Sequence, residues 1–253
     1  LGDVNESFDP TTITDHAPII TGSSVISVNE NQTAVWTVTA SDADGDALTY
    51  SISGMDAHYF SINSSGEITF KIAPDYEDTT TYCGDECKFI VNVSDGNNTA
   101  TQDITVNIND LNESEPSISS SASFTVDENQ TSVGTVTASD ADGDTLTYSL
   151  SGMDASSFNI DASSGVITFK SAPDYETKTS YAVTVSVNDG DNTVTQNVTV
   201  NIRNVNDNSP VITSSGTFNA NENQTSVGRI TATDSDGDTL TYSISGTDAS
   251  SFN

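Results

Sequence analysis

The sequence predicts an all-β chain of tandem Greek-key β-sandwiches. Apolar and polar residues alternate with a period of two, as in the run VTVSVN at 183–188, and no stretch shows a helical period. Turn signals such as NSSGE and DGDN separate these runs. The whole pattern then recurs along the chain. Six or seven short strands in a unit of about 95 residues are typical of an antiparallel sandwich with one face of each strand in the core.

The repeats are marked by the motif N/D-E-N-Q-T. Its glutamates lie 98 and 94 residues apart: Glu30, Glu128 and Glu222. We therefore predict a linker or the tail of a preceding repeat at 1–17, complete repeats at 18–115 and 116–209, and the N-terminal half of a third repeat at 210–253. Because half a sandwich exposes unpaired strand edges, the segment from Pro210 onward is expected to be poorly ordered in isolation.

The composition limits the function. The 253 residues include 37 acidic and 6 basic ones, for a formal net charge of −31. This balance excludes a nucleic-acid-binding protein, because neutralising phosphates requires a basic patch, and it favours affinity for cations. No run approaches the roughly 18 apolar residues of a membrane helix. The N-terminal sequence LGDVNESFDP has neither the basic nor the apolar part of a signal peptide, so any export signal or anchor is expected outside this chain.

The acidic residues are concentrated in a few motifs that recur in each repeat. The loop ASDADGD occupies 40–46 and 138–144, and ATDSDGD occupies 232–238. A P-D-Y-E segment, an aspartate in a D-G turn and a polar string before each boundary proline accompany the loop. Each D-x-D-G-D loop taken alone could be a solvated turn. Oxygen ligands without nitrogen or sulfur partners suit calcium, but the glycine position excludes an EF-hand.

The order of these motifs resembles the cadherin repeat, in the variant common in large bacterial surface proteins. The resemblance rests on N-E-N, A-x-D-x-D, P-D-Y-E, the D-G turn and D/N-x-N-D-N-x-P, and it covers two repeats and about half of the third. It implies immunoglobulin-like sandwiches with calcium bound between consecutive repeats, held from both sides and by the linker. Cadherin junctions usually hold three ions.

The resemblance also implies the ligands. The first junction would use Glu30, Asp75, Glu77, Asp110, Asn112, Glu113, Asp140, Asp142, Asp144 and Asp189. The second junction would use Glu128, Asp174, Glu176, Asn204, Asn206, Asp207, Asn208, Asp234 and Asp236. An N-terminal half-site, empty or weak, would consist of Asp42, Asp44 and Asp95, next to Asp15 and His16 of the preceding linker. Glu113 and Ser114 stand where the family prefers Asp and Asn, so the first junction is expected to have altered geometry or one fewer ion.

Other residues favour structural interpretations. Cys83 and Cys87, in an insertion that we interpret as a hairpin, form either a local disulfide or two free thiols, since a metal site would need two more soft ligands. Trp36 occupies the position of Gly134, where packing is favoured over stacking on a sugar. The sequons at Asn31, Asn129 and Asn223 are copies of one motif beside the expected ligands, and we interpret them as unoccupied.

Two functions remain open. The first is a calcium-stiffened spacer or adhesion module of an extracellular or cell-surface bacterial protein, whose partners are calcium and the neighbouring repeats. The second is a module that itself binds a partner, either homophilically or through surface carbohydrate. Catalysis is not expected, because the acidic motifs recur in every unit whereas an active site normally occurs once. Nucleic acid and membrane insertion of this part of the chain are not expected either.

Overall fold

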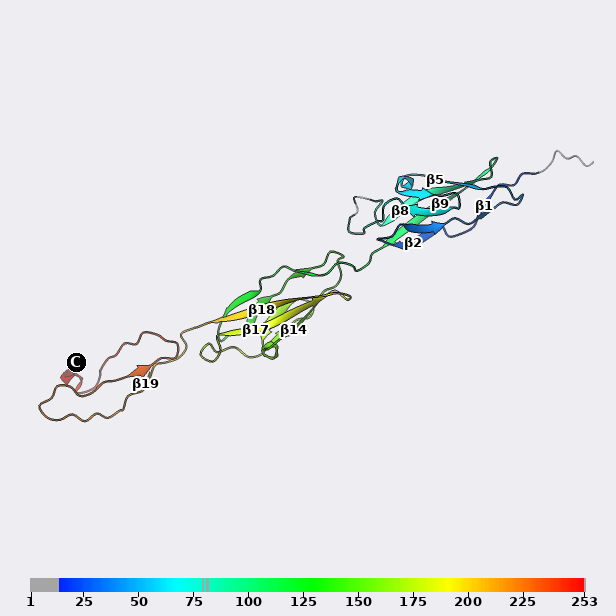
Figure 1. Cartoon of the computed structure of the whole chain (residues 1–253). Helices are drawn as coiled ribbons and strands as arrows, with labels where there is room; N and C mark the ends of the chain where they lie inside the picture. The colour runs from blue at the N-terminus through cyan, green and yellow to red at the C-terminus, as the bar shows by residue number, and fades with distance from the viewer. Residues whose placement is uncertain (1–13, 79, 81, 253) are drawn as a thin grey trace, which may run out of the picture. The chain divides into compact units, whose positions relative to one another are not determined.

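The computed structural model describes residues 14–78, 80 and 82–252 (Figure 1). The chain divides into two compact units between Glu113 and Ser114, and each unit is described by itself. Among the described residues, no helix is both long enough and apolar enough to cross a membrane. The predicted ends of the two complete repeats, at residues 115 and 209, are not tested by this division and remain predictions.

The first unit is a sandwich of a four-stranded and a three-stranded sheet. The four-stranded sheet has the order β2 (Val25–Asn29), β9 (Thr99–Asn109), β8 (Glu86–Ser94) and β5 (Thr49–Ser53) (Figure 1). The three-stranded sheet has the order β3 (Ala34–Thr37), β7 (Glu67–Phe70) and β6 (Phe60–Ile62). The short elements are β1 (Ile19–Ile20), paired with β4 (Ala40–Ser41), and the 3-10 turn η1 (Ala57–Tyr59).

The second unit repeats this plan. Its four-stranded sheet has the order β11 (Ser123–Asp127), β18 (Thr193–Arg203), β17 (Ser180–Asn188) and β14 (Thr147–Ser151). Its three-stranded sheet has the order β12 (Ser132–Thr135), β16 (Val166–Phe169) and β15 (Phe158–Ile160). The short elements are β10 (Ser117–Ile118), paired with β13 (Ala138–Ser139), and η2 (Ala155–Ser157). The predicted all-β tandem sandwiches are confirmed.

One strand pair in each unit departs from the antiparallel plan that we predicted. β2 pairs with β9 in parallel, and β11 pairs with β18 in parallel. The other sheet pairs are antiparallel. Parallel strands need a long connection, and here the rest of the sandwich supplies it. The parallel pair matters for function because both of its strands end at the same edge of the unit.

The core of each unit consists of alternate side chains of the long strands. In β17, Val183, Val185 and Val187 are buried, and the residues between them are half-buried. In the first unit, the ring of Phe60 lies with its centroid 4.6 Å from that of Phe70 and 4.5 Å from that of Phe89. Burying each side chain of this kind contributes about 1.5–3 kcal/mol. The period-two pattern of the sequence is therefore the pattern of burial.

Cys83 and Cys87 form a disulfide with their Cα atoms 5.3 Å apart. Cys87 is fully buried on the central strand β8, where it pairs with Val106 of β9. The interpretation that both cysteines lie in an inserted hairpin is therefore wrong for Cys87. The disulfide connects the segment after P-D-Y-E to the core strand, which is a structural role.

The segment 210–252 has little secondary structure. It contains β19 (Val211–Ile212), which pairs with β20 (Ala232–Thr233), and the 3-10 turn η3 (Ala249–Ser251). Most of its larger apolar side chains are exposed: Val211, Ile212, Phe218, Val227, Ile230, Tyr242, Ile244 and Phe252. The short strand pair nevertheless holds the D-x-D-G-D loop of this segment next to the linker before it.

Candidate metal centre

In each of the two predicted complete repeats, the glutamate of the N/D-E-N motif is a buried carboxylate at the end of the parallel strand pair. Asp127 at the end of β11 lies opposite Arg203 at the end of β18, so Glu128 emerges beside the linker that follows β18. Glu128 is only 2 % exposed. Its Oε2 accepts the backbone N–H of Tyr175 at 2.8 Å and its Oε1 accepts that of Val205 at 2.7 Å. One side chain therefore connects the P-D-Y-E segment to the linker.

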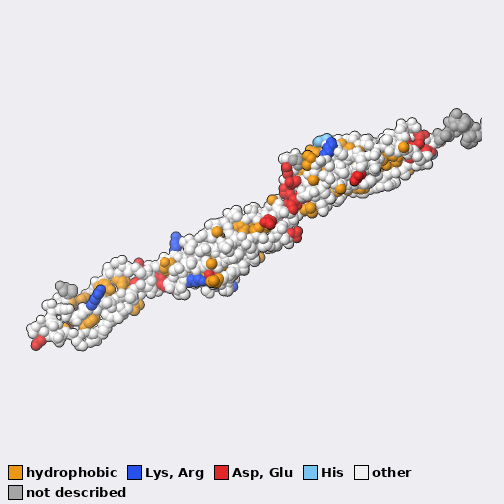
Figure 2. Space-filling model, in the orientation of Figure 1, with side chains coloured by type: hydrophobic (Ala, Val, Ile, Leu, Met, Phe, Trp, Pro, Cys, Tyr) orange, Lys and Arg blue, Asp and Glu red, His pale blue; other side chains and the backbone are white. Residues whose placement is uncertain are grey.

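The first unit repeats this arrangement. Glu30 is 1 % exposed, and its two oxygens accept the backbone N–H groups of Tyr76 at 2.6 Å and of Leu111 at 2.9 Å. Glu30 also forms a group with Asp75 and Glu77 in which one carboxylate oxygen of each lies within 4.8 Å of the others. Figure 2 shows the acidic side chains of this unit gathered mainly at its two ends. The fold, and not the composition alone, concentrates the charge.

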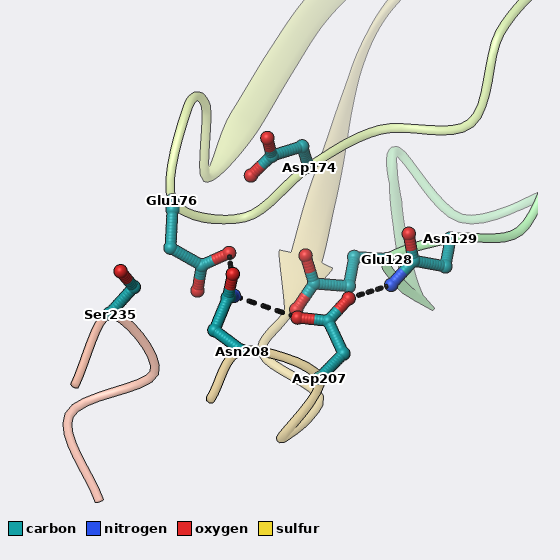
Figure 3. A pocket seen from close by; sticks show the side chains of 7 residues that line it. All are labelled: Glu128, Asn129, Asp174, Glu176, Asp207, Asn208 and Ser235. Atoms are coloured by element: carbon teal, nitrogen blue, oxygen red, sulfur yellow. Dashed lines mark hydrogen bonds between the residues drawn. The ribbon is translucent and has the colours of Figure 1, made fainter. Parts of the chain in front are cut away.

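The second unit contains the fullest group of predicted ligands. Carboxylate oxygens of four residues lie within 4.8 Å of one another: Glu128, Glu176, Asp207 and Asp236. Figure 3 shows the pocket that three of them line together with Asn129, Asp174, Asn208 and Ser235. Two basic side chains of this unit pair with other carboxylates: Lys178 contacts Asp154 and Arg203 contacts Asp127.

The first two D-x-D-G-D loops present buried carboxylate oxygens without a hydrogen-bond partner among the described residues. In the second unit, the backbone N–H groups of Asp142 and Asp144 donate to Oδ1 of Asp140 at 3.1 and 3.4 Å, with Gly143 at φ 79° closing the loop. Oδ2 of Asp140 and Oδ1 of Asp142 are buried and have no hydrogen-bond donor among the described residues. Oδ2 of Asp42 in the first unit is likewise buried and without a hydrogen-bond donor in the described part of the chain. Buried unsatisfied carboxylate oxygens are costly unless a cation binds them, so the donor set fits calcium.

The linker before each loop is attached to it by one recurring hydrogen bond. The backbone N–H of Ser114 donates to Oδ2 of Asp142 at 2.8 Å, and that of Asn208 donates to Oδ2 of Asp236 at 2.7 Å. In the first unit, the N–H of His16 donates to Oδ2 of Asp44 at 2.7 Å. Because a backbone group makes this bond, the serine at 114 preserves it although the side chain differs from asparagine.

The remaining predicted residues are placed as follows. Asp174 accepts the N–H and hydroxyl of Thr177, Asp75 accepts the N–H of Asp78, and Asp234 accepts the N–H groups of Asp236 and Asp238. Asp95 and Asp189 accept N–H groups within their D-G turns, and Glu113 accepts the amide of Asn31. Asn204 donates to the carbonyl of Asp236, and Asn206 donates to Asp238. Asp110 and Asn112 lie in the linker of the first unit.

Two residues near these groups, Asp46 and Asp238, were not predicted as ligands, and Asp15 was expected only as a neighbour in the preceding linker. Asp15 and Asp46 form a group with Asp44 in the N-terminal half-site, where Asp95 and Asp42 are also found in the flanking turns. Asp15 accepts the side-chain amides of Asn97 and Asn98 at 2.9 and 3.0 Å. Asp238 contacts Asn206 in the second unit. The signal for Asp46 and Asp238 in the sequence was the third aspartate of D-x-D-G-D, which recurs in all three loops.

Like charge changes the proton affinity of these groups. Burial raises the pKa of the Asp144 carboxyl, and the neighbouring charges of Asp140 and Asp142 raise it further. Burial likewise raises the pKa of Glu176, with the charges of Glu128 and Asp236 adding to the effect. In contrast, hydrogen bonds from Ser164, first from its backbone N–H, lower the pKa of Asp161 to about 2.

These shifts predict an acid optimum for the stability of the calcium-free protein. A carboxyl with a raised pKa binds more protons in the native state, so stability should rise as the pH falls from neutral through those raised values. Asp161 has the opposite sign, and its contribution is lost as the pH falls from 3.8 to about 2. Melting temperatures measured without calcium at each pH unit should therefore pass through a maximum on the acid side of neutrality. A steady decline from pH 7 downward would contradict this balance.

Comparison with known proteins agrees with the fold and the motifs. A family model described as the cadherin domain matches residues 122–203. The chain is built of cadherin-like repeats. A second family model, described as a bacterial Ig domain, matches residues 15–107. Domains of the cadherin family are extracellular, adhesion-type structural modules that generally bind calcium.

Curated relatives and solved structures support this assignment. Cadherin-related family member 1 of Gallus gallus is 32% identical over 198 residues, covering 70% of this chain and 22% of the relative. Cadherin-87A of Drosophila melanogaster is 34% identical over 200 residues, covering 72% of this chain and 10% of the relative. The chain thus spans about a fifth or less of the length of these relatives.

Among solved structures, mouse Cadherin-23 EC22-24 matches with a TM-score of 0.69 and 25% identity, covering 87% of this chain and 78% of that one. Human Protocadherin-24 EC1-2 matches with a TM-score of 0.59 over 75% of this chain and 98% of that one. Its identity of 22% supports the fold alone.

Proposed function

We propose that this chain is part of a calcium-binding cadherin-like array of a large cell-surface or secreted protein, and that calcium at the repeat junctions stiffens the array for adhesion. The observation that carries the proposal is the group of Glu128, Glu176, Asp207 and Asp236 in the second unit, whose oxygens lie within 4.8 Å of one another. These residues come from the N-E-N turn, the P-D-Y-E segment, the linker and the following D-x-D-G-D loop.

The electrostatics of the group favour a divalent cation. Two carboxylates about 4 Å apart at an effective dielectric of 20 repel each other by about 4 kcal/mol. A bound calcium ion would replace this repulsion by attraction and would join the linker to both of its neighbours. The ligands for calcium in the second unit would come from Glu128, Asp174, Glu176, Asn204, Asn206, Asp207, Asn208, Asp234 and Asp236. In the calcium-free protein, the same charges would loosen the linker.

A spacer is favoured over a carbohydrate-binding module by the position of Trp36. This side chain is only half-buried, but it packs against the core of the first unit and against Gly22. The indole ring is therefore not free to stack on a sugar. The bacterial Ig match at residues 15–107 supports a bacterial cell surface as the source. Catalysis forms no part of the proposal, because the acidic motifs recur in each repeat.

Calcium is expected to bind in at least two saturable steps and to stabilise the chain. A ligand at 100 times its Kd that binds only the native state adds about 2.7 kcal/mol per site. Calorimetric titration of residues 1–253 would count the ions, and melting curves with calcium and with chelator would measure the stabilisation. Small-angle scattering should show a longer and stiffer chain in calcium.

Magnesium is the matched control for these measurements. It demands a smaller octahedral site and keeps its water, so at equal concentration it should produce a much smaller melting shift. Absence of calcium binding at millimolar concentration, with unchanged scattering and melting, would exclude the proposed function. The acidic motifs would then serve only as solvated charge.

A further inference from the structure

The residue after each motif glutamate has an unusual backbone. In the described part of the chain, the non-glycine residues with a left-handed backbone are Asn31, Asn129 and Asn223, at φ 60°, 63° and 67°. Glycine is the default at such positions because it lacks a Cβ, and asparagine is one of the few alternatives. Because the turn alone can explain an asparagine here, the contacts of its side chain decide whether it has a further task.

Asn129 lies in the N-E-N turn and contacts two of the three other segments that meet at the metal group of the second unit. Its backbone N–H donates to the carbonyl of Pro173, which precedes the P-D-Y-E carboxylates, at 3.0 Å. Its side-chain Nδ2 donates to Oδ2 of the linker residue Asp207 at 2.5 Å (Figure 3). The left-handed turn is what points the side chain at the linker while the backbone bonds the other segment.

Asp207 is held at both of its oxygens. Asn129 donates to Oδ2, and Nδ2 of Asn208 donates to Oδ1 at 2.8 Å. Each carboxylate oxygen has a second lone pair that stays available to a cation. The two amides thus fix the rotation of the carboxylate without using up its capacity to bind a metal.

Asn31 makes the corresponding bonds in the first unit. Its N–H donates to the carbonyl of Pro74 at 2.8 Å, and its Nδ2 donates to Oε1 of Glu113 at 2.9 Å. The linker acid is one methylene longer here than Asp207, yet the same amide reaches it. The contact therefore recurs in two units with different linker sequences, which argues against a chance pairing.

We infer that Asn129, and Asn31 as its counterpart, are positioning residues that orient the linker carboxylate toward the cation before the cation binds. This inference rests on the proposed calcium-binding function. Carboxylates that bind metals are themselves commonly held by hydrogen bonds, and loss of such a partner typically weakens metal binding by 10–100-fold. Neither asparagine was among the predicted ligands.

The test is Asn129→Gly, compared with Asn223→Gly as a matched control. Glycine adopts the left-handed backbone readily, so both variants should fold. Asn223 shares the motif and the backbone angle, but its side chain makes no hydrogen bond among the described residues. Protein should be produced in a host without N-glycosylation, because these asparagines lie in sequons.

Calorimetric calcium titration should show one binding step of Asn129→Gly weakened about 10-fold, with Asn223→Gly indistinguishable from the unchanged chain. Melting in chelator should be nearly the same for all three proteins. Unchanged calcium affinity in Asn129→Gly, while the unchanged chain binds normally, would overturn the inference and leave the proposed function intact. A lower melting temperature in chelator with unchanged affinity would also overturn it, because the role would then be structural.

A double-mutant cycle with Asp207→Ala adds a second criterion. If Asn129 acts through Asp207, then Asn129→Gly should cause no further loss of affinity once Asp207 is alanine. Additive losses of affinity would overturn the inference. If the unchanged chain does not bind calcium, that result contradicts the proposed function itself. Failure of the proposed function is thereby distinguished from failure of the inference about Asn129.

Discussion

Replacing Glu128 with alanine is expected to abolish one calcium-binding step and to destabilise the calcium-free protein by about 3 kcal/mol. The carboxylate is 2 % exposed and accepts the backbone N–H groups of Tyr175 and Val205. Hydrogen bonds to a charged acceptor contribute about 1.5–3 kcal/mol each, and a buried donor left without its partner costs about 1–3 kcal/mol. Relief of like-charge repulsion at the metal group offsets part of this loss.

Glu222→Ala is the matched control for this prediction. Glu222 is the third copy of the same motif glutamate, but it is exposed. Chemical denaturation in chelator should show a loss for Glu128→Ala and a change within about 0.5 kcal/mol for Glu222→Ala. Calorimetry should show the calcium step missing in the first variant and retained in the second. Equal effects of the two substitutions would mean that the burial of Glu128 contributes nothing to stability or to calcium binding.

The sequence could predict Glu128 as a ligand, but not its structural role. The motif order placed the glutamate at a junction, because the same motifs recur at one spacing. Its burial depends on the parallel pairing of β11 with β18, which brings the linker beside the N-E-N turn. Alternation of apolar and polar residues reports which face of a strand is buried but not which strand lies beside it. The strand order was therefore the part that pattern alone could not supply.

The positioning role of Asn129 was hidden for a related reason. Its backbone angle and its approach to Asp207 depend on how three distant segments converge. A signal was nevertheless present, since asparagine follows the glutamate in all three motifs. The linker before the second repeat shows the opposite case, in which a sequence difference suggested a structural change to a bond that is in fact retained. Ser114 suggested altered geometry by its side chain, whereas the bond to Asp142 is made by its backbone N–H.

The position of Trp36 illustrates packing that differs between repeats while the backbone is preserved. Trp36 and Gly134 occupy the same place beside a bulge in β3 and β12. A Cβ at Gly134 would meet the ring of Phe124 at 2.6 Å, and a Cβ at Gly22 would meet the ring of Trp36 at 2.7 Å. One aromatic ring therefore fills the space beside the bulge in both repeats. In the first repeat the ring belongs to Trp36 of β3, and in the second it belongs to Phe124 of β11.

Three positions change together in this exchange. The first repeat has Gly22, Ile26 and Trp36, the second has Ser120, Phe124 and Gly134, and the third has Ser214, Phe218 and Gly228. The ring of Phe218 again lies where a side chain at Gly228 would be. A tryptophan requires both a smaller neighbour at the position of Phe124 and a glycine at the position of Ser120. The chain thus contains two compatible solutions to one packing problem.

Gly134→Trp alone should destabilise the second unit by about 3 kcal/mol, because the indole and the ring of Phe124 would compete for one space. The triple variant Ser120→Gly, Phe124→Ile, Gly134→Trp copies the first repeat and should recover stability to within about 1 kcal/mol of the unchanged chain. Chemical denaturation in chelator measures both, and calcium affinity should stay unchanged in the triple variant because the metal group lies elsewhere. If the triple variant is no more stable than Gly134→Trp, the three residues do not form one packing unit, and the tryptophan of the first repeat must be accommodated by differences outside these positions.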